Sequence, residues 1–174
     1  TGAELPSQRL NRFGWPRNIY SRGRDTPVPV DLVITSGAAA TSTTFETVGM
    51  MDEEFFIDFV DYEWALRCRR AGVPIWIAPR AVLRHSVGEP NARRGALRGT
   101  LHGPSRTYYK LRNCFLLFRK RGVPRVFAAL QLATGLAYNL IQVASVAQQR
   151  LYLRTYVTAI RDGLIGVRGR RPVA

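Results

Sequence analysis

The chain has 174 residues, 46% of them hydrophobic and 10% aromatic, which is enough for one buried core and short for two independent domains. Its 26 lysines and arginines against 12 acidic residues give a formal net charge of +14, so we expect an anionic partner such as nucleic acid, acidic lipid or a nucleotide diphosphate. The two cysteines, Cys68 and Cys114, lie far apart, which excludes a disulfide framework and a zinc module and fits a reducing compartment.

The first part of the chain predicts a loop followed by a strand. Residues 1–29 carry four prolines and scattered arginines without periodicity, which predicts an irregular surface segment. The apolar, β-branched residues 30–35 predict a buried strand that stops at a tight turn formed by Ser36 and Gly37. Because strand ends often line the sites of α/β folds, we expect both turn residues at a binding site.

Short elements continue to about residue 104, and several are marked by glycine or by capping residues. In chain order they are a capped helix at 43–49, an acidic and aromatic segment at 51–64, a helix from about Asp61 to Gly72, a strand at 73–78, an extended piece at 81–85 and a loop at 86–104. This alternation of strand and helix predicts an α/β fold.

The remainder of the chain predicts helices. Residues 106–121 place aromatic and aliphatic side chains on one side of a helix, and residues 122–124 interrupt it. Residues 126–149 contain no charged residue, and their number could span a bilayer. Polar residues recur there every three or four positions, and arginines flank both ends. We therefore favour an amphipathic helix in a membrane interface or against a partner, on a par with a plain core helix and ahead of a true span.

Several motifs occur together between residues 30 and 120. They are I-T-S-G at 34–37, D-E-E-F-F-I-D at 52–58, V-D-Y-E-W at 60–64, His85, Arg106, Y-Y at 108–109 and R-N at 112–113. In this order they resemble the family-two inverting glycosyltransferases of the Rossmann-like GT-A fold, closest to the rhamnosyltransferase-like branch. The resemblance implies that residues 1–104 are the acceptor side of the catalytic domain, and residues 105–174 a helical, basic tail that contacts a membrane.

The resemblance assigns Asp61 as the catalytic base. Its carboxylate would take the proton from an acceptor hydroxyl as that oxygen attacks the anomeric carbon from the face opposite the nucleotide, which inverts the sugar. The alternative is that Asp61 only caps a helix, since aspartate is a favoured N-cap. We favour catalysis because the whole segment matches.

Other residues are expected to bind substrate. They are Ser36, Gly37, Asp58, Glu63, Trp64, Arg106 and Arg112, with the two arginines as candidate clamps on a diphosphate. For Glu63 a simple first-turn position in a helix is equally favoured, and for Trp64 core packing is favoured over stacking on a sugar ring.

His85 resembles the histidine that helps to hold a divalent cation, Mn²⁺ or Mg²⁺, in family members. The alternative is an ordinary surface histidine. The family's Asp-x-Asp motif, which binds metal and nucleotide, does not occur in this sequence. We therefore expect the donor-binding half to precede Thr1 and the chain alone to be inactive.

The expected function is transfer of a sugar from a nucleotide-diphosphate donor to a glycan or lipid-linked acceptor, in cell-wall polysaccharide synthesis at the cytoplasmic face of a membrane. Rhamnose is the expected sugar, with another hexose or galactofuranose as alternatives. A non-catalytic basic module that binds membrane or nucleic acid is the alternative from another class. The arginine bias is equally typical of a GC-rich coding sequence. No nucleic-acid-binding signature accompanies the arginines, and the acidic cluster would repel phosphate, so we expect no nucleic-acid partner.

Overall fold

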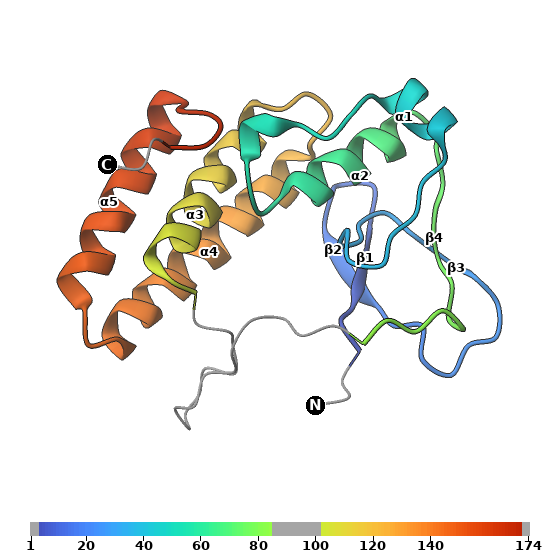
Figure 1. Cartoon of the computed structure of the whole chain (residues 1–174), viewed down its shortest axis with the longest axis horizontal. Coiled ribbons are helices and arrows are strands. Elements are labelled where there is room, and N and C mark those ends of the chain that lie inside the picture. Colours follow the sequence, from blue (N-terminus) through green and yellow to red (C-terminus); the bar gives the residue numbers. More distant parts are fainter. Residues whose placement is uncertain (1–3, 85–101, 172–174) are drawn as a thin grey trace.

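The computed structural model describes residues 4–84 and 102–171 (Figure 1). Strands and short helices occupy one end of the molecule, and three long helices lie side by side at the other. The elements are β1 (Ser7–Leu10), β2 (Pro16–Ile19), β3 (Val28–Val30), α1 (Ser42–Val48), the 3-10 helix η1 (Glu53–Phe55), α2 (Val60–Arg70), β4 (Ile75–Ile77), α3 (Pro104–Arg119), α4 (Arg125–Ser145) and α5 (Gln149–Ile165). The predicted mixture of helix and strand is confirmed.

The N-terminal segment forms a β-hairpin, in which β1 pairs antiparallel with β2. The side chain of Asn11 closes the turn, because its Oδ1 accepts hydrogen bonds from the backbone N–H groups of Phe13 and Trp15, both at 2.9 Å. The prediction of an irregular segment at residues 1–29 is therefore wrong for these strands. The hairpin depends on the Asn11 side chain, which closes its turn. Strands of four residues are too short to show a clear alternation of polar and apolar residues in the sequence.

β3 pairs antiparallel with β4, so these strands form a second two-stranded sheet. The strand predicted at residues 30–35 is displaced, because β3 ends at Val30. Asp31 then leaves the ladder: its carboxylate accepts a hydrogen bond from the Leu10 N–H at 2.6 Å and pairs with Arg69 Nε at 3.0 Å. Within residues 4–84 and 102–171 no parallel pairing occurs, so the expected Rossmann-like GT-A arrangement is not confirmed.

The predicted helices of the first half are present. α1 is capped by Thr41, whose hydroxyl accepts a hydrogen bond from the Thr44 N–H at 3.3 Å, and it ends at Gly49 with a φ of 83°. α2 begins at Val60 and is followed by Gly72 at a φ of 73°. Positive φ angles of this kind are readily adopted by glycine, which explains both helix ends.

One apolar core joins the two ends of the molecule. It packs Leu32 and Phe55 together with Leu116 of α3 and Phe127 of α4, all of them buried. A second cluster lies between α3 and α5 and is built largely from tyrosines. The helical region thus packs directly on the segment that precedes α2, while its separation as a domain from residue 105 stays a prediction.

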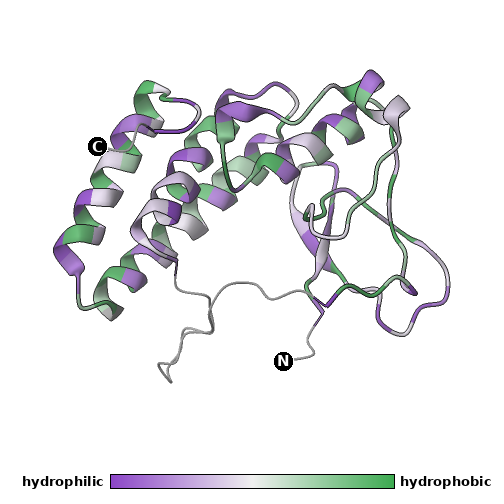
Figure 2. Cartoon of the chain, viewed as in Figure 1, coloured by the Kyte–Doolittle hydropathy of each residue, from purple (hydrophilic) through white to green (hydrophobic). Residues whose placement is uncertain are grey.

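α4 is long and apolar enough to cross a membrane by length and composition alone, with a mean hydropathy of 1.4 over Arg125–Ala144 and 22% of that segment buried. Part of its polar stripe faces the protein: Gln142 donates to the His102 carbonyl at 3.1 Å and accepts from the Tyr156 hydroxyl at 3.2 Å. Leu140 and Ile141 are 71% and 45% exposed. Hydrophobic and hydrophilic stretches alternate along these helices in Figure 2. The exposure of Leu140 and Ile141 shows that α4 presents apolar side chains to the outside.

Candidate active site

A short loop between η1 and α2 has an unusual backbone. Phe56, Asp58 and Phe59 have φ angles of 63°, 61° and 65°, a region that residues with side chains rarely adopt. Each such residue costs about 1–3 kcal/mol, so the surrounding structure must hold the loop in place. Strained residues of this kind cluster at functional sites, and this loop lies in the segment that resembles the glycosyltransferase motif.

Two neighbouring side chains of α3 hold the loop. The Asn113 amide donates to the carbonyls of Phe55, Ile57 and Asp58 at 2.7–3.0 Å. The Arg112 guanidinium donates to the carbonyls of Phe55 and Gly169 at 3.0 and 2.7 Å, and also to the Asn113 side chain. Arg112 is 0% exposed, so its position shapes the loop and offers no N–H group to a diphosphate.

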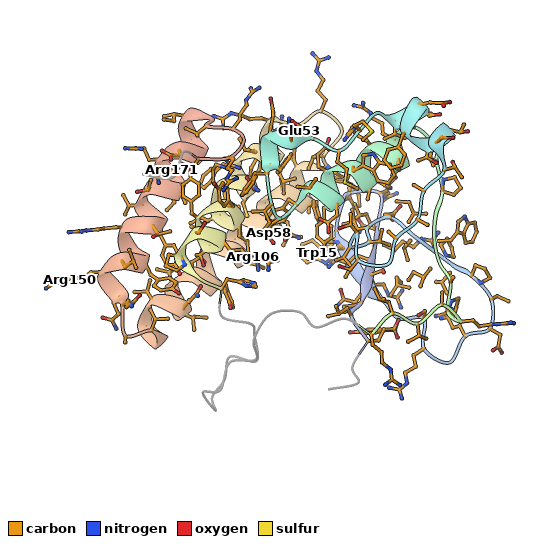
Figure 3. The ribbon with its side chains drawn as sticks, viewed as in Figure 1. Trp15, Glu53, Asp58, Arg106, Arg150 and Arg171 are labelled. Atoms are coloured by element: carbon orange, nitrogen blue, oxygen red, sulfur yellow. The ribbon has the colours of Figure 1, made fainter. Side chains whose placement is uncertain are left out.

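Asp58 and Arg106 lie side by side and form a bidentate ion pair (Figure 3). Arg106 Nε and a terminal nitrogen donate to the two carboxylate oxygens of Asp58 at 3.2 and 3.1 Å. The Arg106 side chain is 42% exposed, so the pair is open to a substrate. The structure therefore brings together two residues that the sequence predicted at the site.

Asp61 lies in the first turn of α2. The N-cap of α2 is Phe59, which precedes it by two residues, so Asp61 does not fill the capping position considered as its alternative role. Its Oδ1 accepts a hydrogen bond from the Tyr62 N–H at 2.9 Å. Burial raises the pKa of Asp61, and the charge of Asp58 acts in the same direction, while hydrogen bonds from backbone amides including that of Thr35 oppose the rise. A raised pKa makes the carboxylate a stronger base.

The turn formed by Ser36 and Gly37 follows Thr35, so it lies close in sequence to the backbone amide that contacts Asp61. Gly37 has a φ of 77°, and a Cβ at this position would approach Leu83 Cδ2 to 2.9 Å. The backbone angle therefore favours glycine, whereas the close contact is with the end of an exposed leucine side chain that can move aside. The turn thus directly follows the residue whose backbone amide contacts Asp61, and the contact of the turn with substrate stays a prediction.

Glu63 and Trp64 fix α1 on α2. Glu63 is 4% exposed, and both of its carboxylate oxygens accept from Arg67 Nε, at 2.9 and 3.0 Å. The terminal nitrogens of Arg67 donate to the carbonyls of Val48 and Met50, both at 2.7 Å. Trp64 donates its indole N–H to the Gly49 carbonyl at 2.8 Å. These contacts account for both side chains structurally, and their predicted roles in substrate binding stay predictions.

His85 lies outside the described residues. The other histidine, His102, was not singled out from the sequence, although it stands just before the helix that carries Arg106. Burial lowers the pKa of His102, and the charges of Arg106 and Lys110 lower it further, which favours the neutral imidazole, while the charge of Asp58 opposes the shift. Its place beside the ion pair makes it a further candidate for contact with substrate.

The described residues do not supply a complete site for a divalent cation. No group of three or more histidine, cysteine, aspartate or glutamate side chains in residues 4–84 and 102–171 could hold one. Asp58 is already paired with Arg106, and Asp61 faces backbone amides. The expected Mn²⁺ or Mg²⁺ would therefore need ligands beyond these residues.

The chain is similar to the dTDP-rhamnosyl transferase RfbF of Shigella flexneri. The two are 33% identical over 164 residues, which are 94% of this chain and 55% of that protein. The chain thus spans about half the length of this relative. No protein-family model matches the chain, and no solved structure matches it at a significant level. The likeness supports the class predicted from the sequence, a rhamnosyltransferase-like glycosyltransferase.

Proposed function

We propose that this chain is the acceptor side of an inverting rhamnosyltransferase, which transfers rhamnose from a dTDP donor to a glycan or lipid-linked acceptor. The observation that supports it most is the 33% identity with a dTDP-rhamnosyl transferase along almost the whole chain. The half-buried Asp61, with its raised pKa, adds a carboxylate suited to act as a base.

In this proposal Asp61 accepts the proton of the attacking acceptor hydroxyl. The acceptor oxygen forms a bond to the anomeric carbon, the bond from that carbon to the donor diphosphate breaks, and the nucleotide diphosphate leaves with the electron pair. The Asp58–Arg106 pair orients the acceptor, because it presents both a carboxylate and a guanidinium to a sugar hydroxyl. The left-handed loop fixes the distance between Asp58 and Asp61.

The donor-binding residues belong to another part of the protein in this proposal. The sequence lacks an Asp-x-Asp motif, and the chain corresponds to 55% of the relative. A divalent cation, if used, would be held mainly by that part, with His85 as a candidate ligand. When bound, such a cation neutralises charge on the leaving diphosphate. The chain alone would then be inactive.

We place the protein at the cytoplasmic face of a membrane. The proposal rests on the outward apolar side chains of α4 and on the arginines of α5, a combination that suits an anionic lipid surface.

Transfer by the full-length protein tests this function. With dTDP-rhamnose and an isolated acceptor glycan, we expect a new rhamnosyl linkage whose anomeric configuration, read by NMR, is opposite to that of the donor. Other dTDP and UDP sugars should react far more slowly. Retention of configuration would refute the role of Asp61, and preference for another donor would refute the sugar assignment.

A further inference from the structure

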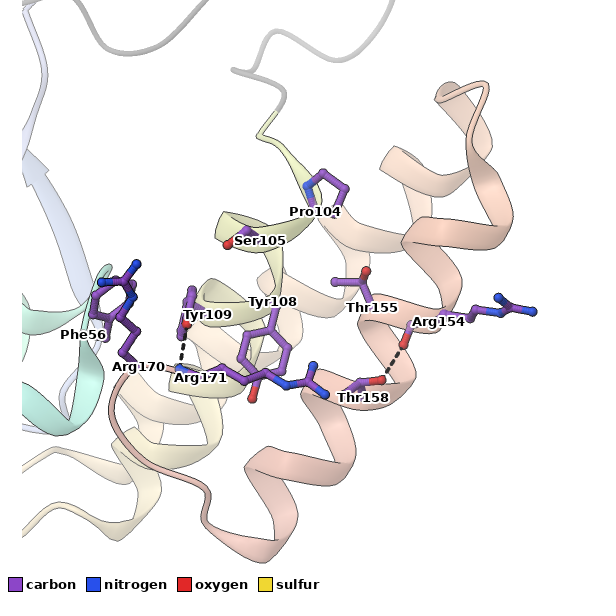
Figure 4. A pocket seen from close by; sticks show the side chains of 10 residues that line it. All are labelled: Phe56, Pro104, Ser105, Tyr108, Tyr109, Arg154, Thr155, Thr158, Arg170 and Arg171. Atoms are coloured by element: carbon purple, nitrogen blue, oxygen red, sulfur yellow. Dashed lines mark hydrogen bonds between the residues drawn. The ribbon is translucent and has the colours of Figure 1, made fainter. Parts of the chain in front are cut away.

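A pocket of about 420 Å³ lies between the start of α3, the middle of α5 and the segment after α5 (Figure 4). Its polar and charged lining includes Arg154, Arg170 and Arg171, and its aromatic lining includes Phe56, Tyr108 and Tyr109. From this arrangement we propose that the pocket binds a diphosphate ester group of the acceptor. The inference rests on the proposed function and names a binding site that the function does not by itself require.

The charge of the pocket points to an anion with more than one negative charge. None of the ion pairs in the described part of the chain involves the three pocket arginines, whereas Arg106, Arg161 and Arg168 each pair with a carboxylate. Asp162, which interacts electrostatically with Arg171, already accepts from the Tyr108 hydroxyl at 2.8 Å and from Arg161 at 2.8 and 2.9 Å. Figure 4 shows the Arg154 side chain pointing away from Tyr108 and Arg171, so Arg170 and Arg171 carry the positive charge of the pocket. Two guanidinium groups match a phosphate ester better than a single carboxylate.

Aromatic rings orient two of these guanidinium groups without using their N–H donors. The guanidinium carbon of Arg170 lies 5.5 Å from the centre of the Phe56 ring, and that of Arg171 lies 5.3 Å from the centre of the Tyr108 ring. Guanidinium groups stacked in this way keep their five donors for an anion. The Tyr109 hydroxyl accepts from the Arg171 backbone N–H at 2.9 Å, so its own proton can still be donated.

The segment that carries Arg170 and Arg171 is held in place. Arg168 pairs with Glu54 at 2.6 Å, and the Gly169 N–H donates to the Glu54 carbonyl at 2.7 Å. The Gly169 carbonyl in turn accepts from Arg112. The arginines are therefore presented by a fixed segment, which lowers the entropy lost when an anion binds.

The position of the pocket favours the acceptor over the donor. Phe56 and Ser105 line it, and Asp58 and Arg106 follow them closely in sequence and form the ion pair of the candidate active site. Leu151, which is 48% exposed, lies one helical turn before Arg154 and Thr155 on α5. A diphosphate in the pocket would therefore lie close to the loop that carries Asp58, and an exposed apolar side chain stands one turn away on α5.

Calorimetric binding to the full-length protein tests this site, with inorganic diphosphate, farnesyl diphosphate and dTDP as probes. Replacing both Arg170 and Arg171 by glutamine should weaken the binding of inorganic diphosphate and of farnesyl diphosphate at least about tenfold, since each probe loses charge-assisted contacts. The matched control is Arg12→Gln with Arg150→Gln, two exposed arginines outside the pocket. We expect it to bind all three probes as the wild type does.

Tighter binding of farnesyl diphosphate than of inorganic diphosphate would assign the group to a lipid-linked acceptor, and equal binding would assign it to a soluble phosphate ester; both support the pocket. Absence of diphosphate binding, or an equal loss in the control variant, would overturn it. A matching loss of dTDP binding in the pocket variant would show a donor site and overturn the acceptor assignment. Because binding needs no turnover, failure of sugar transfer alone would refute the proposed function and leave this result standing.

Discussion

At the scale of single residues, the site depends on one buried pair of neighbours on α3. Asn113 and Arg112 supply hydrogen bonds to a loop whose backbone would otherwise not keep three left-handed residues. The loop ends in the N-cap of α2, so its conformation sets where Asp61 stands. The two α3 residues thus position the candidate base without contacting it.

Asn113→Ala should therefore destabilise the protein. It removes the amide that serves three backbone carbonyls and also an acceptor of Arg112, and buried groups left without partners cost about 1–3 kcal/mol. Urea unfolding measures the loss. Asn18→Ala, at an exposed position in β2, is the control and should change the free energy of unfolding by less than about 0.5 kcal/mol. Equal effects of both changes would show that Asn113 does not hold the loop.

At the scale of elements, α4 combines features that the sequence could not separate. The uncharged residues of α4 are compatible with a membrane-spanning helix, an interfacial helix and a core helix. The structure shows one side packed on the protein, where Gln142 is 1% exposed and bonded to α5, and another side with exposed leucine and isoleucine. This arrangement leaves apolar side chains of α4 exposed, and α5 carries exposed arginines.

We therefore expect the protein to float with liposomes that contain anionic lipid, and less with neutral ones, because apolar contact and charge both contribute. Replacing Leu140 and Ile141 by glutamine should reduce flotation several-fold. Met50→Gln, which removes an equally exposed apolar side chain at the other end of the molecule, should leave it unchanged. Equal recovery with neutral and anionic vesicles would contradict a role for the arginines, and no flotation would contradict membrane contact altogether.

At the scale of the whole molecule, local signals predicted more than long-range ones. Helix ends marked by glycine or by a capping threonine were predictable, because caps are set by a few adjacent residues. The hairpin was missed, and the first strand was displaced by the contacts of Asp31 with Leu10 and Arg69, which lie far from it in sequence. The partners of Asp58 and Arg112 are likewise distant in sequence, so their pairing could not be read from spacing.

The most direct measurement concerns Asp61. In the full-length protein, the rate of rhamnosyl transfer should fall by about 10²- to 10⁴-fold in Asp61→Asn, because the amide cannot accept the acceptor's proton. Affinity for the donor should change little, and the fold should survive, since asparagine can keep the hydrogen bond from the Tyr62 N–H. In the wild type, activity should fall as the pH drops through the raised pKa of Asp61, because only the ionised carboxylate is a base, so the acidic limb should lie above the ordinary aspartate range. A folded Asp61→Asn variant with wild-type turnover would contradict this role and leave Asp58 as the candidate base.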